Sequence, residues 1–207
     1  MIPYLLAGLL GYVLGAIPTG AVFVRLLQGK DIRRYGSGHT GGTNVGRLAG
    51  FWPGALTALV DAVLGAVAVW LAGSLFRDPW AAAVSGVAAI IGHNWSVFIA
   101  LGGGIGLSTL TGAVVAGDPA SGLTALALIG ATWLVLVLLV KAHRARATVY
   151  VMLGAGVALL VAGAPVQVLA LGIAGGLVVV VKTLPDWHRE YSNTRGATKL
   201  EERSDAT

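Results

Sequence analysis

Residues 51–75 of the chain read FWPGALTALVDAVLGAVAVWLAGSL, an apolar stretch in which Asp61 is the only ionisable side chain. A helix of roughly 20 apolar residues crosses the hydrocarbon core of a bilayer, so this stretch predicts a membrane-spanning helix. The whole chain has the same character: 56% of its 207 residues are hydrophobic and 11% are charged, whereas about a quarter of the residues of a soluble domain are charged. The sequence therefore predicts an all-α, polytopic membrane protein.

Seven apolar segments are candidate spans, joined by glycine-rich loops. A closed β-barrel, the other structure that can cross a membrane, is excluded because no strand-length segment alternates between apolar and polar residues. The fourth candidate is short and rich in Gly, Ser and Thr, so it is either a half-helix or a continuation of the glycine run before it. The predicted spans are Ile2–Leu27, Phe51–Leu75, Trp80–Leu101, Gly106–Gly117, Ser121–Val140, Thr148–Gly163 and Val166–Thr183.

The basic residues predict the orientation of these spans. All of them except Arg77 follow or end the first, fifth and seventh spans, which share one face of the membrane in a seven-span layout. Because basic residues concentrate on the cytoplasmic side, we expect the N-terminus outside and the C-terminus in the cytoplasm. The net charge of +5 then reflects topology and contact with anionic lipid headgroups, with no nucleic-acid partner. Residues 1–190 are expected to form a single transmembrane domain, followed by a polar, disordered tail over 191–207.

A glycine-rich run, GSGHTGGTNVGR, occupies residues 36–47 between the first two predicted spans. Glycine permits positive φ and a close approach of the backbone to a ligand, and successive N–H groups in such a turn can bind an anion. Ser37, Thr43 and Asn44 add neutral hydrogen-bonding groups, and Arg47 adds a planar, permanently charged guanidinium suited to phosphate. The run predicts a phosphate-binding loop; the alternative is a flexible linker.

A second unusual run extends from Gly92 to Thr109, across the end of the third span and the loop that follows it. Irregular glycine-rich backbone at membrane depth is tolerated where it is buried in protein or lines a cavity, so both runs are expected to meet on the cytoplasmic face. His93 is either a proton-transfer group near the site or a histidine satisfied by a neighbouring helix. Asp61 is either functional or paired with a basic residue.

These residues resemble the motifs of the bacterial acyl-phosphate:glycerol-3-phosphate acyltransferases. Gly36-Ser37-Gly38, Gly41, Thr43-Asn44 and Arg47 are similar to the first motif, Gly92-His93 with Gly103-Gly104, Gly106 and Thr109 to the second, and Asp61 with Gly65 to an element between them. The resemblance covers about residues 5–185. It implies an inner-membrane enzyme of phospholipid synthesis that moves a fatty acyl group from acyl phosphate to the 1-hydroxyl of glycerol 3-phosphate, with no cofactor and no metal.

The resemblance also implies roles for individual residues, since attack of a hydroxyl on an acyl phosphate requires two oriented ligands and stabilised negative charge. The proton acceptor is His93 or the leaving phosphate; the sequence leaves both open. The expected partners are acyl phosphate, glycerol 3-phosphate or another small acceptor, and membrane lipids. The expected catalytic residues are Ser37, Asn44 and His93, and the expected substrate- or phosphate-binding residues are Gly36, Gly38, Thr43, Arg47, Gly103, Gly104, Gly106 and Thr109.

The chain departs from the family pattern at several positions. His39 stands where Asn is usual and Gly42 where Ala is usual, and lysines of the family motifs are replaced by Leu64, Gly102 and Ile105. A third motif matches only loosely, over residues 188–193. Either Arg33, Arg34, Arg47 and backbone N–H groups suffice for phosphate, or the acceptor or the donor is less anionic, or activity is lost. A transporter is disfavoured because the polar runs face one side of the membrane only.

Overall fold

The computed structural model of the protein describes residues 1–188, and this part of the chain is helical with no β-strand. Three short 3-10 helices connect or end the longer ones: η1 (Ile32–Arg34), η2 (Val97–Ile99) and η3 (Leu184–Asp186). The α-helices are α1 (Ile2–Gly15), α2 (Thr19–Gln28), α3 (Gly42–Ala49), α4 (Phe51–Phe76), α5 (Pro79–Asn94), α6 (Leu107–Gly117), α7 (Pro119–Leu138), α8 (Arg144–Leu153), α9 (Ala155–Val161) and α10 (Val166–Thr183).

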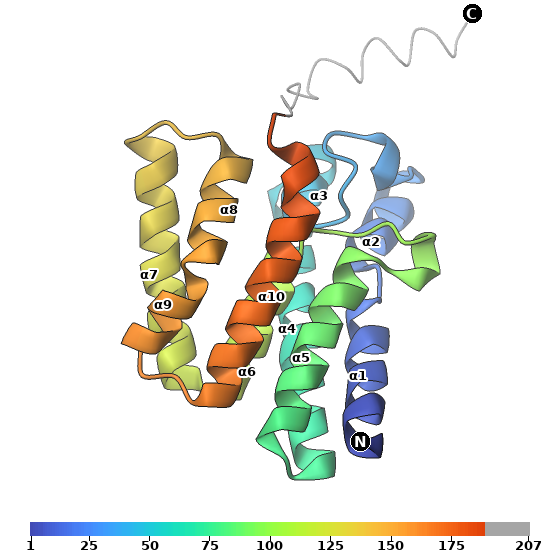
Figure 1. Cartoon of the computed structure of the whole chain (residues 1–207). Helices are drawn as coiled ribbons and strands as arrows, with labels where there is room; N and C mark the ends of the chain where they lie inside the picture. Colours follow the sequence, from blue (N-terminus) through green and yellow to red (C-terminus); the bar gives the residue numbers. More distant parts are fainter. Residues whose placement is uncertain (189–207) are drawn as a thin grey trace, which may run out of the picture.

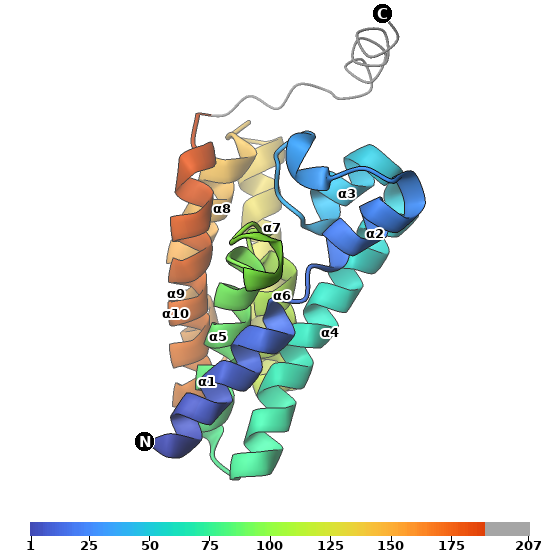
Figure 2. The ribbon, with the colours of Figure 1, turned by 90° about the vertical axis from the view of Figure 1, so that its right-hand side faces the viewer.

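The helices form a bundle with the N-terminus at one end and the last described residues at the other (Figure 1). Helices α7, α8 and α9 form a layer on one side of α10, and α1, α4 and α5 lie on its other side (Figure 1). The short helices α2 and α3 lie at the end of the bundle opposite the N-terminus (Figure 2). The most extensive helix contacts are those of α1 with α5 and of α4 with α6.

The prediction of an all-helical, multi-pass membrane protein is confirmed, and the lengths of the spans are refined. Four stretches are long and apolar enough to cross a membrane: Ile2–Gln28, Phe51–Phe76, Pro119–Leu138 and Val166–Asp186. Helices α8 and α9 together pass the same test, with a bend of 48° between them. The count of seven spans remains a prediction, because α5 ends at Asn94 and α6 has only 11 residues.

The first predicted span is divided into two helices by Pro18. Proline has no N–H to donate and disfavours helical backbone in the residue before it, so α1 ends at Gly15 and α2 begins at Thr19. The change of direction at this break carries the chain from the bundle to the end that holds the glycine-rich loops (Figure 2). Pro18 thus interrupts the helical backbone within the first candidate span, Ile2–Gln28, which leads to residues 36–47.

Glycines bring the backbones of α1 and α5 into direct contact. A Cβ built at Gly11 would collide with the carbonyl of Ser85, and one built at Gly15 with the carbonyl of Ala89. The reverse contact occurs at Gly92, where a Cβ would collide with the carbonyl of Tyr12. Small residues permit such close approach of helices in lipid, where van der Waals packing replaces the hydrophobic effect as the driving force.

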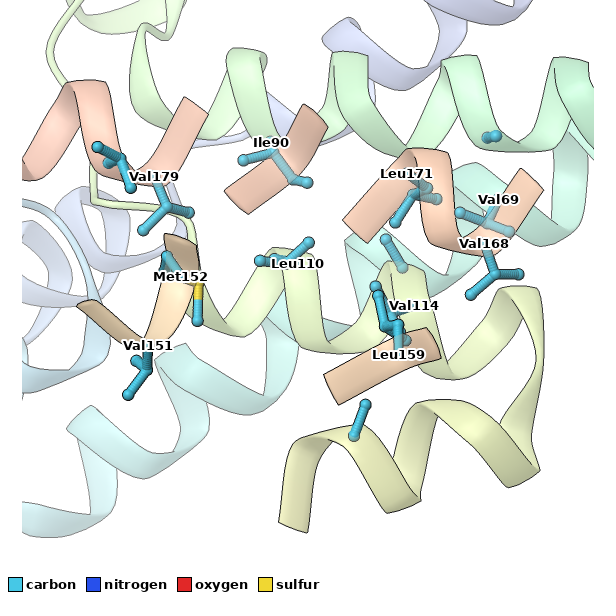
Figure 3. Close-up of a cluster of buried hydrophobic side chains, with 14 of the residues drawn as sticks. Val69, Ile90, Leu110, Val114, Val151, Met152, Leu159, Val168, Leu171 and Val179 are labelled. Carbon is cyan, nitrogen blue, oxygen red and sulfur yellow. The ribbon is translucent and has the colours of Figure 1, made fainter. Parts of the chain in front are cut away.

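The main apolar core lies between α5, α6, α8, α9 and α10 (Figure 3). Ile90 of α5, Leu110 of α6 and Leu171 of α10 interdigitate there, and each is at least nine-tenths buried. The outer helix faces carry many exposed large apolar side chains, such as Leu26 and Trp70. In water such a surface would cause association, and in a bilayer it contacts the lipid chains.

The close contact of α1 with α5 predicts that Gly15→Ala destabilises the protein. The added methyl group overlaps the backbone of α5, and overpacking of this kind costs about 1–3 kcal/mol. Gly130→Ala is the matched control, because a Cβ at Gly130 meets nothing within 4 Å and alanine is the better helix former. Thermal unfolding in detergent should show a lower midpoint for Gly15→Ala and an equal or higher one for Gly130→Ala. Equal midpoints for the two variants would contradict the packing analysis.

Candidate active site

A cavity of about 260 Å³ lies among the helices near the end of the bundle that holds α2 and α3. Two loops approach it, the first loop (residues 35–41) and the second loop (residues 95–106). Helices α3, α4, α5, α6, α7, α8 and α10 and the 3-10 helix η3 supply the rest of its wall. The lining residues are Ser37, His39, Gly41, Gly42, Thr43, Asn44, Arg47, Ala58, Asp61, His93, Ile105, Gly106, Leu107, Ser108, Trp133, Arg144, Ala145, Thr148, Thr183 and Asp186.

The side-chain amide of Asn44 holds the first loop in shape. Its Oδ1 accepts the backbone N–H of Ser37 at 3.2 Å, and its Nδ2 donates to the carbonyls of Tyr35 at 3.0 Å and His39 at 2.9 Å. Asn44 is 3% exposed, so these hydrogen bonds are shielded from water. Gly36 (φ +57°) supplies the turn around the amide, and a Cβ there would collide with its oxygen. Asn44 therefore fixes the backbone on which Ser37 is presented.

Helix α3 begins at the cavity. Gly41, Gly42 and Thr43 line the cavity at the start of the helix, where free N–H groups and the helix dipole favour a negative charge. Arg47 follows Thr43 by four residues and so lies on the same helix face, and it also lines the cavity. The first turn of α3 contains no acidic side chain.

The glycine at position 42, where the family motif usually has alanine, is explained by helix packing. A Cβ built at Gly42 would lie 2.5 Å from the carbonyl oxygen of Gly54 on α4, and one built at Gly54 would lie 2.7 Å from Cα of Gly46. Helices α3 and α4 therefore cross with their backbones in contact. This contact explains why alanine is excluded here and places α3 directly over the first turns of α4.

Asp61 and His93 form a buried polar pair in the bundle interior. His93 Nδ1 lies 3.7 Å from Oδ1 of Asp61, and the hydroxyl of Thr19 donates a hydrogen bond to the same oxygen. Asp61 is 1% exposed and His93 8% exposed, yet both line the cavity. His93 therefore faces the cavity and lies beside a carboxylate of a neighbouring helix, and a role in proton transfer stays a prediction.

The second loop packs against the end of α5 and against the first loop. A Cβ at Gly104 would collide with Nε2 of His93, and one at Gly103 would collide with the carbonyls of His93 and Asn94. The N–H of Thr40 donates to the carbonyl of Gly103 at 3.3 Å, which joins the two loops. Gly106 (φ +85°) then turns the chain into α6. These glycines give the loop room to lie on α5.

Arg33 links η1, the segment just before the first loop, to the second loop. Its Nη1 donates to the carbonyl of Ile99 at 3.0 Å, and its Nε and Nη2 donate to the carboxylate of Asp31. These hydrogen bonds lower the pKa of the Asp31 carboxyl to about 2, so the ion pair persists at neutral pH. Arg33 therefore stabilises the loop pair from outside the cavity lining.

The structure brings together some of the predicted site residues. Ser37, Thr43, Asn44, Arg47, His93 and Gly106 line the cavity. Gly36, Gly38, Gly103, Gly104 and Thr109 lie outside its lining. Of this second set, the loop glycines shape the turns and the loop packing described above, and the carbonyl of Thr109 packs against Gly65 of α4. A direct ligand contact for the second set stays a prediction.

Sequence reasoning missed the residues that the C-terminal half contributes to the cavity. Asp186, 3% exposed, lies just beyond α10, and its Oδ2 is 2.6 Å from Nε2 of His39. Trp133, Arg144, Thr148 and Thr183 complete this wall. The unusual histidine in the first glycine run was the available signal, but its partner lies 147 positions away. Of the loosely matching third motif, only His188 lies within the described residues.

The fold and the cavity define a polytopic helical membrane protein with a polar site built from two glycine-rich loops. The sequence matches the family described as "Glycerol-3-phosphate acyltransferase" over residues 5–192, and the chain belongs to that family. It is 38% identical over 94% of its length to the glycerol-3-phosphate acyltransferase of Rubrobacter xylanophilus, covering 92% of that protein. It is 33% identical to a relative with the same description from Trichormus variabilis, over 88% of this chain and 86% of the other.

A solved structure shares the fold. The crystal structure of PlsY, an integral membrane glycerol 3-phosphate acyltransferase, in its glycerol 3-phosphate form, superposes with a TM-score of 0.75 at 30% sequence identity. The similarity covers 94% of this chain and 98% of that one. The lysophosphatidic acid form of the same enzyme gives a TM-score of 0.72. The bundle and the arrangement of its loops are therefore those of an enzyme family.

The hydrogen bonds of Asn44 predict that Asn44→Asp loosens the first loop. A carboxylate can still accept the N–H of Ser37, but it cannot donate to the carbonyls of Tyr35 and His39 and is repelled by them. Buried carbonyls left unsatisfied cost about 1–3 kcal/mol each. Hydrogen exchange of the amides in residues 35–41, followed by mass spectrometry, should be faster by at least tenfold, with residues 80–90 of α5 unchanged. Unchanged protection of the loop would refute this role for Asn44.

Proposed function

We propose that this protein transfers a fatty acyl group from acyl phosphate to the 1-hydroxyl of glycerol 3-phosphate, and so makes a lysophosphatidic acid in the cell membrane of a bacterium. The family membership of the chain supports this proposal. The observation that carries it is a single cavity lined by the start of α3, by Ser37 and Arg47, and by the buried pair of Asp61 and His93. Such a cavity offers phosphate-binding groups beside a proton-transfer group.

The reaction needs orientation more than it needs a nucleophile from the protein. The substrate hydroxyl oxygen bonds to the acyl carbon, the bond from that carbon to the phosphate oxygen breaks, and inorganic phosphate leaves. Acyl phosphate is a mixed anhydride and is already activated, so no covalent enzyme intermediate is required. The protein has to hold both substrates in line and stabilise the negative charge that develops on the carbonyl oxygen.

Ser37 and the start of α3 would supply that stabilisation. The Oγ of Ser37 lies 3.4 Å from the N–H of His39 and accepts from it, so the hydroxyl proton stays available for a ligand. Arg47 presents two parallel N–H groups that match two phosphate oxygens. Thr43 adds a hydroxyl on the same helix face as Arg47. Asn44 would act through the backbone that it positions.

His93 or the leaving phosphate would accept the hydroxyl proton. The structure supports a role for His93 because Asp61, 3.7 Å from its Nδ1, can stabilise an imidazolium. The phosphate dianion is the other acceptor, and it would lie against the same cavity wall. Neither Gln nor Asn can accept the proton, but both can form hydrogen bonds. If His93→Gln loses turnover and His93→Asn keeps it, the side chain at position 93 acts by hydrogen bonding and the phosphate accepts the proton.

The site would face the cytoplasm, with the N-terminus outside. Helices α2 and α3 and the start of α8, which hold the first two basic groups, lie at the cavity end of the bundle. The turn between α4 and α5, which contains Arg77, lies at the opposite end (Figure 1). Residues 1–190 would act as one domain. The predicted tail over 191–207 lies outside the described residues. Basic residues at the cavity end favour its cytoplasmic placement and access to soluble glycerol 3-phosphate.

Purified protein with acyl phosphate should acylate glycerol 3-phosphate, and substitution of Arg47 should lower kcat/KM. Arg47→Lys should retain part of the activity, since a point charge cannot reproduce a bidentate contact. Arg47→Ala should cost about 2–3 kcal/mol in transition-state binding, the scale of a charge-assisted hydrogen bond. Arg34→Ala is the control, because this exposed arginine lies outside the cavity lining. Equal kinetics for all three variants would refute the phosphate-loop role.

A panel of acceptors that includes glycerol tests whether the enzyme prefers an acceptor less anionic than glycerol 3-phosphate.

Reporter fusions test the orientation. Fusions after residue 47, after residue 144 and at the C-terminus should report the cytoplasm, because these positions lie at or follow the basic end of the bundle. A fusion between Leu75 and Trp80 should report the outside. If the fusions after residues 47 and 144 report opposite faces, the proposed orientation and a single site shared by the two halves are both wrong.

A further inference from the structure

Two arginines supply the permanent positive charge of the cavity. Among its lining residues, all within the described part of the chain, these are Arg47 from α3 and Arg144 from α8. The lining carboxylates, Asp61 and Asp186, each lie beside a histidine. Ile105 also lines the cavity and contributes no charge. A ligand with a phosphate group therefore meets the permanent cations of this cavity at α3 and α8.

The same two arginines line a second hollow next to the cavity. This hollow, of about 600 Å³, lies along α3 and the first turns of α4. It shares with the cavity five lining residues: Gly42, Thr43, Arg47, Ala58 and Arg144. Arg47 and Arg144 therefore stand where the two hollows join, although they belong to segments almost 100 positions apart in the chain.

Arg144 stands at an exposed helix end that favours a negatively charged ligand. Arg144 is the first residue of α8, and within Arg144–Leu153 no acidic side chain occupies the first turn. The N-terminal end of a helix carries a partial positive charge, so a cation there is destabilising. Arg47 and the N-terminal end of α3 add further positive charge to the lining of the same cavity. A phosphate bound in the cavity would offset the unfavourable field at this helix end.

The rest of α8 is anchored in a way that leaves Arg144 directed to the site. Arg146 donates to the carbonyl of Trp187 at 3.3 Å, and its guanidinium lies 5.7 Å from the centre of the Trp187 ring. Residues two apart on a helix point to different sides, so Arg146 serves packing while Arg144 lines both hollows. The imidazole of His143 caps the helix by accepting the N–H of Ala145.

We propose that Arg144 is a second phosphate-binding residue of this active site, acting with Arg47 on the phosphate of one of the two substrates. The proposal deepens the proposed function and rests on it for the identity of the ligand. The shared chemistry is a phosphate monoester or acyl phosphate dianion, held by two guanidiniums with parallel N–H groups. Arg144 thereby supplies charge that Ile105 does not, and it selects for phosphorylated substrates.

The test is the kinetics of Arg144→Gln, with Lys141→Gln as the control. Lys141 lies in the loop before α8, is exposed, and lines neither hollow. Lys141→Gln therefore removes the same charge from the protein as Arg144→Gln without changing the cavity. KM is measured for glycerol 3-phosphate at saturating acyl phosphate, and for acyl phosphate at saturating glycerol 3-phosphate. We expect Arg144→Gln to raise at least one KM tenfold or more, and Lys141→Gln to leave both within twofold. The substrate whose KM rises is the one whose phosphate Arg144 binds.

A second site change separates lost charge from a disturbed helix start. Ile105→Lys, introduced into Arg144→Gln, returns a cation to the same cavity and should recover at least a third of the lost affinity. Values of both KM for Arg144→Gln within twofold of the wild type, in a protein that forms product, would overturn the proposal. The proposal would also be overturned if neither Arg144→Lys nor Ile105→Lys in the Arg144→Gln background had a lower KM than Arg144→Gln alone. Only arginine at position 144 would then support binding, and positive charge in the cavity would not be the reason.

Ligand binding without turnover distinguishes failure of this proposal from failure of the proposed function. Inorganic phosphate and glycerol 3-phosphate should each raise the thermal midpoint of the wild type and of Lys141→Gln. The shift should be less than half as large in Arg144→Gln. If the wild type forms no acylated product but shows this pattern, the proposed function fails and the phosphate site stands. Equal shifts in Arg144→Gln and the wild type, or no shift in either, would overturn the phosphate site itself.

Discussion

Direct contact between helix backbones is the constraint on which the rest of this structure depends. At Gly15 on α1 and Gly65 on α4 there is no space for a side chain, because the carbonyls of Ala89 and Thr109 occupy it. In lipid, such contacts gain dispersion energy at no cost in side-chain entropy. They also set the positions of polar residues next to them. Gly92 packs on α1 beside His93, and Gly112 packs on Ala62 beside Asp61, so the buried pair is held by the helix crossings on either side.

The loops extend the same principle from helices to irregular backbone. Irregular backbone at a membrane requires internal partners for its N–H and C=O groups. Here the amide of Asn44 satisfies three groups of the first loop, and the N–H of Thr40 reaches the carbonyl of Gly103 in the second. The glycines of both loops make room for these contacts. A rigid loop pair, once formed, presents Ser37 without a cost for ordering at the moment of binding.

The sequence predicted the parts of the structure that depend on local pattern. Hydropathy identified the helical membrane class, and the glycine-rich runs located the two loops that approach the cavity. Span ends were less accurate, since α5 stops at Asn94 where the polar second loop begins, and apolar residues such as Phe98 continue in that loop. The contact of Asp186 with His39 could not be predicted, because nothing local relates residues so far apart. Likewise, Arg144 was assigned to topology alone, since a basic residue after a span needs no other explanation.

The distribution of charge in the cavity suits the two phosphorylated substrates of the proposed reaction. Its carboxylates, Asp61 and Asp186, lie beside His93 and His39, which limits the negative field that a phosphate would meet. Its guanidiniums, Arg47 and Arg144, lie where the cavity joins the hollow along α3 and α4. Two phosphorylated ligands repel one another, and at an effective dielectric constant of about 20 two unit charges 4 Å apart interact by about 4 kcal/mol. In the proposed reaction, guanidiniums that pair with the phosphate of one ligand would reduce the repulsion that the other ligand meets.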